Sequence, residues 1–557
     1  MNARIRRPGW RLACLLALVL ALTACSGGTA TPKATSISTL AASATASPTN
    51  DASSAPPTAT TTPAPTTSAP ATAPGASAVP ASPTATRASA TPTQAATPAV
   101  PPVSDWVRFG FDPARSGVNP VETRISPQMV AGLRQQWRVT LPGVADSSPI
   151  LLHDLAFPDG TMRDVLYVTT RDGRLLAVDA ANGAVLWSKQ PSGPKITHSS
   201  PVADPARKLV YAYGLDGLLH RYDAVTGDER MGNGWPVQIT LMRDTEKESA
   251  SLNIAGDTIY VTTSGYLGDA PPYQGHVVIV DAPTGQTHVF NSLCANLPRL
   301  LKQGDCQSQR SGIWARAGVV LDPATGNLFV ATGNGRFNAD SGGNDFGDSV
   351  IQLSPDGTKV IDSYTPQDYQ ELDDRDADLG STAPALLPRI ANSKTPLLLV
   401  QGGKDGLLRL VNRQNMSGQG GPGHVGGELQ AIKATGCGTF TQPVVWTDPG
   451  GALWVIVAGQ CALDAYQIVT DAGGTTRLQP AWTVQQRFTT PVLAGGVLFA
   501  SGNGAVLALD PRTGKQLWSS ANPGAGGTIG GIHWESPIVI NGTLYATDEQ
   551  GTLVAYR

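Results

Sequence analysis

Residues 167–187, YVTTRDGRLLAVDAANGAVLW, and residues 499–518, FASGNGAVLALDPRTGKQLW, are two copies of one pattern. Each copy contains two strand-like runs joined by Asp172-Gly173 or Asn503-Gly504, dipeptides that supply the positive φ of a tight hairpin turn. A second turn, at Asn182-Gly183 in the first copy, leads into a strand that ends in Trp. Each copy therefore predicts a hairpin followed by a further antiparallel strand.

Eight such units follow one another along the chain, and each opens with a short step of the Ser-Pro or Thr-Pro type or its equivalent. The steps recur roughly every 45 to 70 residues, which fits one four-stranded blade plus loop insertions. They lie at Ser147, Ser199, Ser249, Trp314, Ser381, Phe440, Phe488 and Trp534. The spacing predicts an all-β chain that forms a single eight-bladed β-propeller.

The last unit lacks a fourth strand. Residues 543–557, TLYATDEQGTLVAYR, stop after the third strand, whereas residues 135–141, QQWRVTL, precede the first blade with the right period and carry Trp137. We expect this N-terminal strand to complete the final blade, because closure removes the free edges that a sheet must otherwise protect. We also expect Trp187, Trp482 and Trp518 to pack between neighbouring blades.

The first 25 residues resemble a bacterial lipoprotein signal. Four arginines precede the apolar residues 12–22, and Leu22-Thr23-Ala24-Cys25 follows as a lipobox. The apolar run is too short to span a bilayer, so residues 1–25 are predicted to be an export signal peptide, with Cys25 as the lipidation site. The alternatives are an ordinary signal peptide or an uncleaved anchor. The prediction is an extracytoplasmic protein held on the bacterial membrane through its lipidated Cys25.

Composition divides the remainder into two parts. Residues 26–103 are almost entirely Ala, Thr, Pro and Ser and predict a disordered low-complexity linker. Residues 104–557 are predicted to form the propeller without an internal boundary.

The net charge of −3, with no run of Lys or Arg after the signal peptide, argues against a nucleic-acid partner. We expect a monomer whose axial funnel takes a protein partner or a small alcohol.

Four of the six cysteines remain once Cys14 leaves with the signal and Cys25 takes lipid. In an exported protein these four predict two disulfides. The start of a first strand and the end of the second lie at the same axial end of a blade, which favours Cys437–Cys461 and leaves Cys294–Cys306 to hold one loop. No Cys-x-x-Cys-His occurs, so no haem is predicted.

The same geometry collects polar residues on one axial face, at the openings of first strands and in the turns after second strands. Solvated polar groups surround the funnel of any propeller. A position on this axial face therefore does not by itself give a residue a functional role. The set comprises Asp146, His198, Glu248, Trp314, Arg316, Asn334, Asp378, Lys404, Arg487, Asn503, His533, Glu535 and Asp548.

Several of these positions lie in longer motifs. Residues 312–335 (GIWARAGVVLDPATGNLFVATGNG), 378–384 (DLGSTAP), 402–413 (GGKDGLLRLVNR) and 530–537 (GGIHWESP) keep a recognisable order. Together with Asp105-Trp106 near the start of the predicted propeller, they resemble the pyrroloquinoline-quinone (PQQ) dehydrogenases, and most closely the polyvinyl-alcohol-dehydrogenase-like branch. The resemblance spans the predicted propeller and implies the same fold.

The resemblance also implies roles, with PQQ and Ca²⁺ as cofactors. Asn334 occupies the position at which the family has an amide ligand to Ca²⁺. Asp378 occupies the position of the family's catalytic base, which is also predicted to be a metal ligand. Lys404 falls on a basic residue that meets the quinone, and Trp314 on the floor against which the quinone stacks. A hard cation takes oxygen ligands, and a carboxylate can remove an alcohol proton. The alternatives are a turn Asn, a capping Asp and a Trp packed between blades.

The departures from the family pattern are equally informative. Residues 264–269, SGYLGD, contain no Glu where the family supplies a metal ligand, so Asp269 is the candidate replacement. The adjacent Cys-Cys pair that covers the quinone is absent, and so is the Arg expected in the second unit, where residues 197–200, THSS, stand. PQQ carries three carboxylates, which would be costly to bury without partners.

Two interpretations follow. The favoured one is a surface-tethered, quinoprotein-like propeller that serves as a non-catalytic binding or scaffold module. The alternative is a PQQ- and calcium-dependent alcohol dehydrogenase with Asp378 as base and Asn334 as metal ligand.

Overall fold

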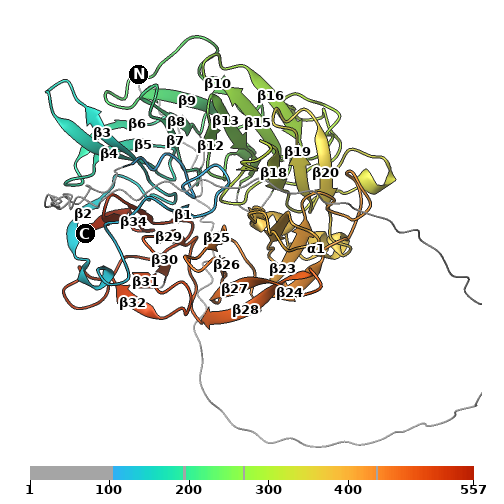
Figure 1. Cartoon of the computed structure of the whole chain (residues 1–557). Helices are drawn as coiled ribbons and strands as arrows, with labels where there is room; N and C mark the ends of the chain where they lie inside the picture. The colour runs from blue at the N-terminus through green and yellow to red at the C-terminus, as the bar shows by residue number, and fades with distance from the viewer. Residues whose placement is uncertain (1–103, 192, 194–195, 267–269, 435–436, 503) are drawn as a thin grey trace, which may run out of the picture. The chain divides into compact units, whose positions relative to one another are not determined.

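A computed structural model describes residues 104–557, apart from residues 192, 194–195, 267–269, 435–436 and 503. The predicted signal peptide with Cys25, the predicted linker and Asp269 lie outside the described residues. Eight blades, each of four antiparallel strands, form a ring (Figure 1), which confirms the predicted eight-bladed propeller.

Each blade runs in sequence order from its first strand to its fourth. The first four blades are β3 (Ile150–Ala156), β4 (Met162–Thr169), β5 (Leu175–Asp179) and β6 (Val185–Lys189); β7 (Val202–Asp204), β8 (Leu209–Tyr213), β9 (Leu218–Asp223) and β10 (Val237–Gln238); β12 (Asn253–Ala255), β13 (Thr258–Thr262), β15 (His276–Asp281) and β16 (Thr287–Asn291); and β17 (Val320–Leu321), β18 (Leu328–Ala331), β19 (Val350–Leu353) and β20 (Val360–Tyr364).

The last four blades follow the same plan, except that the eighth takes its outermost strand from the N-terminal side. They are β21 (Ala385–Leu386), β22 (Leu398–Gln401), β23 (Leu407–Asn412) and β24 (Gln430–Lys433); β25 (Val444–Thr447), β26 (Leu453–Ala458), β27 (Leu463–Thr470) and β28 (Thr476–Val484); β29 (Val492–Ala494), β30 (Val497–Gly502), β31 (Ala505–Leu509) and β32 (Gln516–Ser519); and β33 (Ile538–Ile540), β34 (Thr543–Thr547), β35 (Thr552–Tyr556) and β2 (Gln135–Thr140).

The ring closes in the eighth blade. Strand β2 pairs antiparallel with β35, with Gln135 opposite Tyr556 and Thr140 opposite Thr552. In Figure 1 the N-terminal β2 lies beside the C-terminal strands of this blade. The predicted closure by the segment around Trp137 is confirmed.

Tryptophans at fourth strands connect neighbouring blades. The indole Nε1 of Trp187 donates to Ala224 O over 3.1 Å, and that of Trp137 donates to Ala180 O over 3.0 Å. Trp482 and Trp518 repeat the contact with Pro511 O and Leu133 O. Three of the acceptors belong to the next blade and Leu133 lies in the segment that leads into β2 of the next blade, so the predicted inter-blade packing is confirmed.

A short N-terminal segment, residues 106–119, fills the centre of the ring. Backbone hydrogen bonds join Trp106 to Leu151 in the first blade and Gly117 to Leu493 in the seventh. The segment ends in β1 (Val118–Asn119), which pairs parallel with β29. Its carbonyls also accept hydrogen bonds from Ala203, Leu321 and Val445, in the second, fourth and sixth blades. The segment therefore links innermost strands around most of the ring.

Little structure lies outside the blades. Strands β11 (Glu246–Lys247) and β14 (Ser264–Gly265) form a small ribbon beside the third blade, and α1 (Tyr369–Asp374) is one short helix. Within the described part of the chain, no helix has the length and hydropathy needed to cross a membrane.

Both predicted disulfides are present. Cys437 and Cys461 are bonded with Cα atoms 5.7 Å apart, and Cys294 and Cys306 are bonded with Cα atoms 6.1 Å apart. The first bond joins the loops before β25 and after β26, as expected for two segments at one axial end.

The contact between Trp137 and the turn of the first blade generates a stability prediction. Gly183 has φ +78°, and a Cβ there would lie 2.8 Å from the Trp137 ring and 2.7 Å from Val139. Gly160 has φ +81° but no atom within 4 Å of its Cβ position. Gly160→Ala should cost about 1–2 kcal/mol from the left-handed backbone alone. Gly183→Ala should cost about 1–3 kcal/mol more, because the blades must separate.

Chemical denaturation of the two variants measures this difference. Equal losses in the free energy of unfolding would contradict close packing of β2 against the first blade.

Candidate functional site

A cavity of about 200 Å³ opens on the axial face. Its walls come from segments that precede first strands or follow second strands, in six of the eight blades. The lining residues are His198, Lys247, Ser249, Ser264, Gly265, Tyr266, Trp314, Arg316, Lys404, Phe440 and Trp534.

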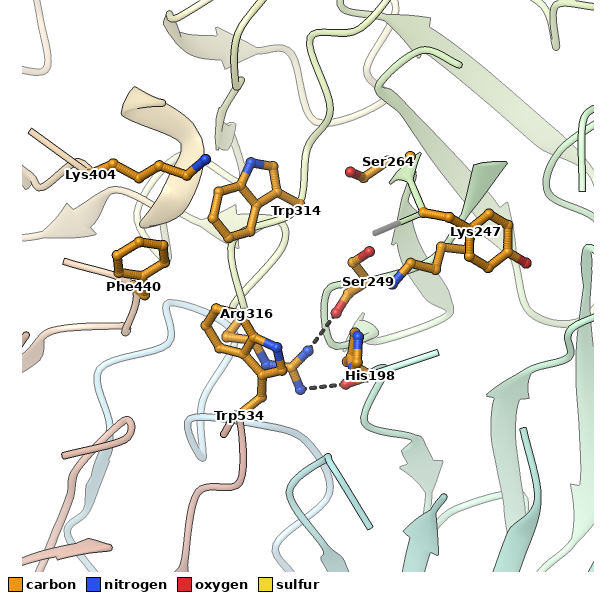
Figure 2. Close-up of a pocket in the computed structure, with 11 residues that line it drawn as sticks. His198, Lys247, Ser249, Ser264, Trp314, Arg316, Lys404, Phe440 and Trp534 are labelled. Carbon is orange, nitrogen blue, oxygen red and sulfur yellow. Dashed lines mark hydrogen bonds between the residues drawn. The ribbon is translucent and has the colours of Figure 1, made fainter. Parts of the chain in front are cut away.

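Three aromatic rings form one wall of the cavity. Trp314, Phe440 and Trp534 lie with ring centroids 6.1–6.3 Å apart, and Figure 2 shows them grouped on one side. Each ring is half-buried, so part of its surface faces the cavity. Half-exposed aromatic surface of this kind can stack against a flat ligand.

Basic side chains surround the aromatic wall. Lys404 Nζ lies 5.3 Å from the Trp314 ring centre, and the Arg316 guanidinium lies 5.9 Å from that of Trp534. Across the cavity, Lys247 Nζ lies 5.7 Å from the ring centre of Tyr266. No Asp or Glu occurs among the described residues that line the cavity. Its lining therefore favours an anionic ligand.

Arg316 is held rigidly. Its guanidinium donates to Ser249 O and His198 O, which joins the fourth blade to the second and third (Figure 2). Burial lowers the pKa of Arg316 to about 10, so the side chain remains charged at neutral pH. A fixed positive charge that needs no reorganisation can bind an anion at small entropic cost.

Asn334, Asp378 and Lys404 come together at one edge of the cavity. Asn334 N donates to Asp378 Oδ1 over 2.6 Å, and Lys404 Nζ contacts Asp378 Oδ2. Asp376 Oδ1 accepts from Lys404 Nζ over 2.8 Å and from Asn334 Nδ2 over 2.9 Å. Burial raises the pKa of Asp378, although the Lys404 ammonium opposes the shift. The geometry unites these residues; their roles as ligand, base and quinone contact stay predictions.

The fit of this corner to Ca²⁺ is partial. Asn334 Oδ1 is buried without a hydrogen-bond partner among the described residues, and together with the Asp378 carboxylate it offers oxygen ligands. The position after Ser264-Gly265 holds Tyr266, whose hydroxyl donates to Arg243 O over 3.2 Å. Asp269, the predicted third ligand, lies outside the described residues.

The site residues predicted from the sequence do not include Lys247, Phe440 or Trp534. All three stand within two residues of the opening step of a blade, which is the signal that could have identified them. Glu248 was among the axial candidates, but it is fully buried and accepts a hydrogen bond from Ser199 Oγ over 2.9 Å.

Glu246 anchors the ribbon that carries Lys247. It is fully buried, accepts from Gln274 N over 2.8 Å and from the Thr240 hydroxyl, and burial raises its pKa to about 8. The unfolded chain has a pKa of about 4.3, so the folded state holds one extra proton between these values. The free energy of unfolding should therefore fall as the pH rises through this window, by up to about 1.4 kcal/mol per pH unit.

Glu246→Gln removes the ionisable group. The slope of the unfolding free energy against pH should therefore be smaller by the equivalent of about one bound proton between pH 5 and 8. Denaturant unfolding across this range measures it. Glu371→Gln, at an exposed position on α1, is the control and should keep the wild-type slope. An unchanged slope in Glu246→Gln would show that Glu246 is ionised in the folded protein.

Comparisons with known proteins show which family the chain is similar to. A family model described as outer membrane protein assembly factor BamB matches residues 131–336 and 443–557, which is more than half of the chain. Quinohemoprotein alcohol dehydrogenase ADH IIB of Pseudomonas putida is 25% identical over 342 residues, covering 56% of this chain and 46% of that protein. Quinohemoprotein alcohol dehydrogenase of Comamonas testosteroni is 23% identical over 344 residues, covering 56% and 45%. The matches thus span about half the length of these relatives.

Solved structures agree with the fold. Quinohemoprotein alcohol dehydrogenase ADHIIG of Pseudomonas putida HK5 superposes with a TM-score of 0.58 and 16% identity, over 81% of this chain and 80% of that one. A europium-containing methanol dehydrogenase superposes with a TM-score of 0.56 and 16% identity, over 79% and 89%. The eight-bladed ring, the repeat motifs and the family match lead to one conclusion. The chain belongs to the family of PQQ-repeat, quinoprotein-like β-propellers that the BamB model describes.

Proposed function

We propose that the chain is an extracytoplasmic binding propeller whose axial cavity takes a flat aromatic polycarboxylate of the PQQ type. The observation that carries the proposal is the combination of an aromatic wall with Lys247, Arg316 and Lys404 in a lining free of described acidic residues. Lys247, Arg316 and Lys404 offer positive charge to the carboxylates of PQQ, with Lys404 also paired to Asp376 and Asp378, and Trp314 offers a stacking surface. Charge-assisted hydrogen bonds of this kind are the strong ones.

Location supports a binding role at the cell envelope. Two disulfides hold described loops, and such bonds persist in oxidising compartments. The lipobox at Cys25 and the Ala/Thr/Pro/Ser segment to residue 103 support a tether. The proposal is a propeller anchored through lipidated Cys25 and separated from the membrane by this linker.

A second candidate, the PQQ- and calcium-dependent alcohol dehydrogenase, is favoured by the corner of Asn334, Asp378 and Lys404. Bound PQQ with Ca²⁺ supplies a hydride acceptor with a polarised carbonyl. Asn334 Oδ1 and the Asp378 carboxylate would hold the ion, and Asp378 would take the alcohol proton. Lys404 would hold Asp378 in its ionised form through their contact.

Titration with PQQ tests the binding proposal. PQQ should quench the fluorescence of the protein, because Trp314 and Trp534 line the cavity. Lys247→Gln and Lys404→Gln should each weaken binding about 10- to 100-fold, because each removes one charge-assisted hydrogen bond of about 1.5–3 kcal/mol. Lys359→Gln, at an exposed position between β19 and β20, is the control. Equal affinity in all four proteins would contradict the proposed site.

Dye-linked oxidation of alcohols, with PQQ and Ca²⁺ added, separates the two candidates. If the chain is a dehydrogenase, Asp378→Asn should lower kcat on the order of 10²- to 10⁴-fold, the usual contribution of a general base. Circular dichroism checks that the variant is folded. PQQ binding without any alcohol oxidation by the wild-type protein would leave the binding module as the function.

A further inference from the structure

A second group of ligand-type side chains, which shares His198 with the cavity lining, has no role assigned by the proposed function. Asp146, His198 and His533 precede β3, β7 and β33, the first strands of three consecutive blades of the closed ring. Asp146 Oδ2 lies 2.8 Å from His198 Nδ1 and 2.8 Å from His533 Nδ1. The two imidazole rings are nearly perpendicular, with centroids 5.7 Å apart. Closure of the ring therefore brings two imidazoles onto one carboxylate oxygen.

Hydrogen bonding accounts for only part of this arrangement. Asp146 accepts from His533 Nδ1 over 2.8 Å and from Trp534 N over 3.0 Å. His198 Nδ1 is equally close to Asp146 Oδ2, but not in hydrogen-bonding geometry, and His198 Nε2 also has no partner among the described residues. His198 is only 4% exposed. His198 Nδ1 thus has an ion-pair contact without a hydrogen bond and Nε2 has neither, so the buried imidazole leaves room for a further partner.

The spacing suits a metal ion. One ligand atom from each of the three residues lies within 4.8 Å of the other two. Ligands bound at about 2.0–2.2 Å in tetrahedral or octahedral geometry are themselves roughly 3 Å apart, as Asp146 Oδ2 is from each imidazole. Two imidazole nitrogens and one carboxylate oxygen suit Zn²⁺, Fe²⁺, Ni²⁺ or Cu²⁺ better than Ca²⁺ or Mg²⁺.

Two more carboxyl groups lie beside this cluster. Glu535 and Glu549 form a second such group with Asp146, and each has an Oε1 atom without a hydrogen-bond partner in the described part of the chain. Arg171 lies 3.8 Å from Asp146 and 3.5 Å from Glu549, and partly balances these carboxylates. Outer carboxylates that orient or neutralise a site are a regular feature of metal centres.

We propose that Asp146, His198 and His533 bind a divalent transition-metal ion of the Zn²⁺ class. Three protein ligands leave at least one coordination position for water or another ligand, as in catalytic rather than purely structural zinc sites. The site is distinct from the Asn334–Asp378 corner, and its proposal does not depend on PQQ binding.

Zn²⁺ binding to the metal-stripped full chain, measured by calorimetry and by metal analysis after dialysis, tests the proposal. We expect one Zn²⁺ per chain, with affinity reduced on the order of 100-fold or more in His533→Gln and in Asp146→Asn. His220→Gln is the matched control. His220 Nδ1 lies 2.6 Å from Glu229 and its Nε2 lies 3.1 Å from Asp216, but no second imidazole joins them in a described three-residue group.

Spectroscopy of the wild-type protein keeps the test independent of variant folding. Cu²⁺ added at one equivalent should show electron paramagnetic resonance hyperfine structure from two nitrogen ligands. Sub-stoichiometric Zn²⁺, affinity unchanged in both ligand variants, or a Cu²⁺ spectrum without two nitrogens would each overturn the proposal. The cluster would then be a hydrogen-bonded His–Asp–His group, with any Zn²⁺ adsorbed elsewhere. All measurements are made without PQQ, so failure here leaves the proposed function intact.

Discussion

The antiparallel pairing of β2 with β35 is the interaction on which the rest of the structure depends. It joins residues 135–140 to residues 552–556 and converts a row of seven complete sheets and one incomplete sheet into a ring. Without closure the first and eighth blades would expose the edges and faces that now cover each other. Closure also sets Asp146 of the first blade 2.8 Å from His533 of the eighth. One strand pairing therefore supports both the core and part of the axial face.

Two repeated devices keep the ring rigid enough to carry sites. The Trp indoles at fourth strands donate to carbonyls of the following blade, and small turn residues such as Gly183 let the rings approach closely. Residues 106–119 meanwhile fill the centre and bond to innermost strands of several blades. The buried Arg115 in this segment donates to Ser251 O and Leu252 O of the third blade. The cavity walls are consequently fixed by the core and the central segment together.

The axial face carries two chemistries next to each other. One side holds aromatic rings and cations, with Arg316 fixed by the carbonyls of Ser249 and His198. The other side holds the carboxylate and imidazoles of Asp146, His198 and His533. His198 belongs to both, because its ring lines the cavity and its Nδ1 faces Asp146. The second cluster of ligands thus includes a residue of the segment 197–200, where the family resemblance predicts an Arg.

The amino-acid sequence by itself determined the blade count, the closing strand, the inter-blade Trp contacts and both disulfides, because each depends on local periodicity, turn chemistry or a repeated position. It also pointed to Asn334, Asp378 and Lys404 and to the face on which they lie. Only the tertiary structure decided which axial residues touch. Asp146 and His533 are 387 residues apart in sequence, and Trp314, Phe440 and Trp534 come from three different blades. Contacts between axial side chains of different blades depend on the curvature of the closed ring and on side-chain direction, which no local pattern encodes.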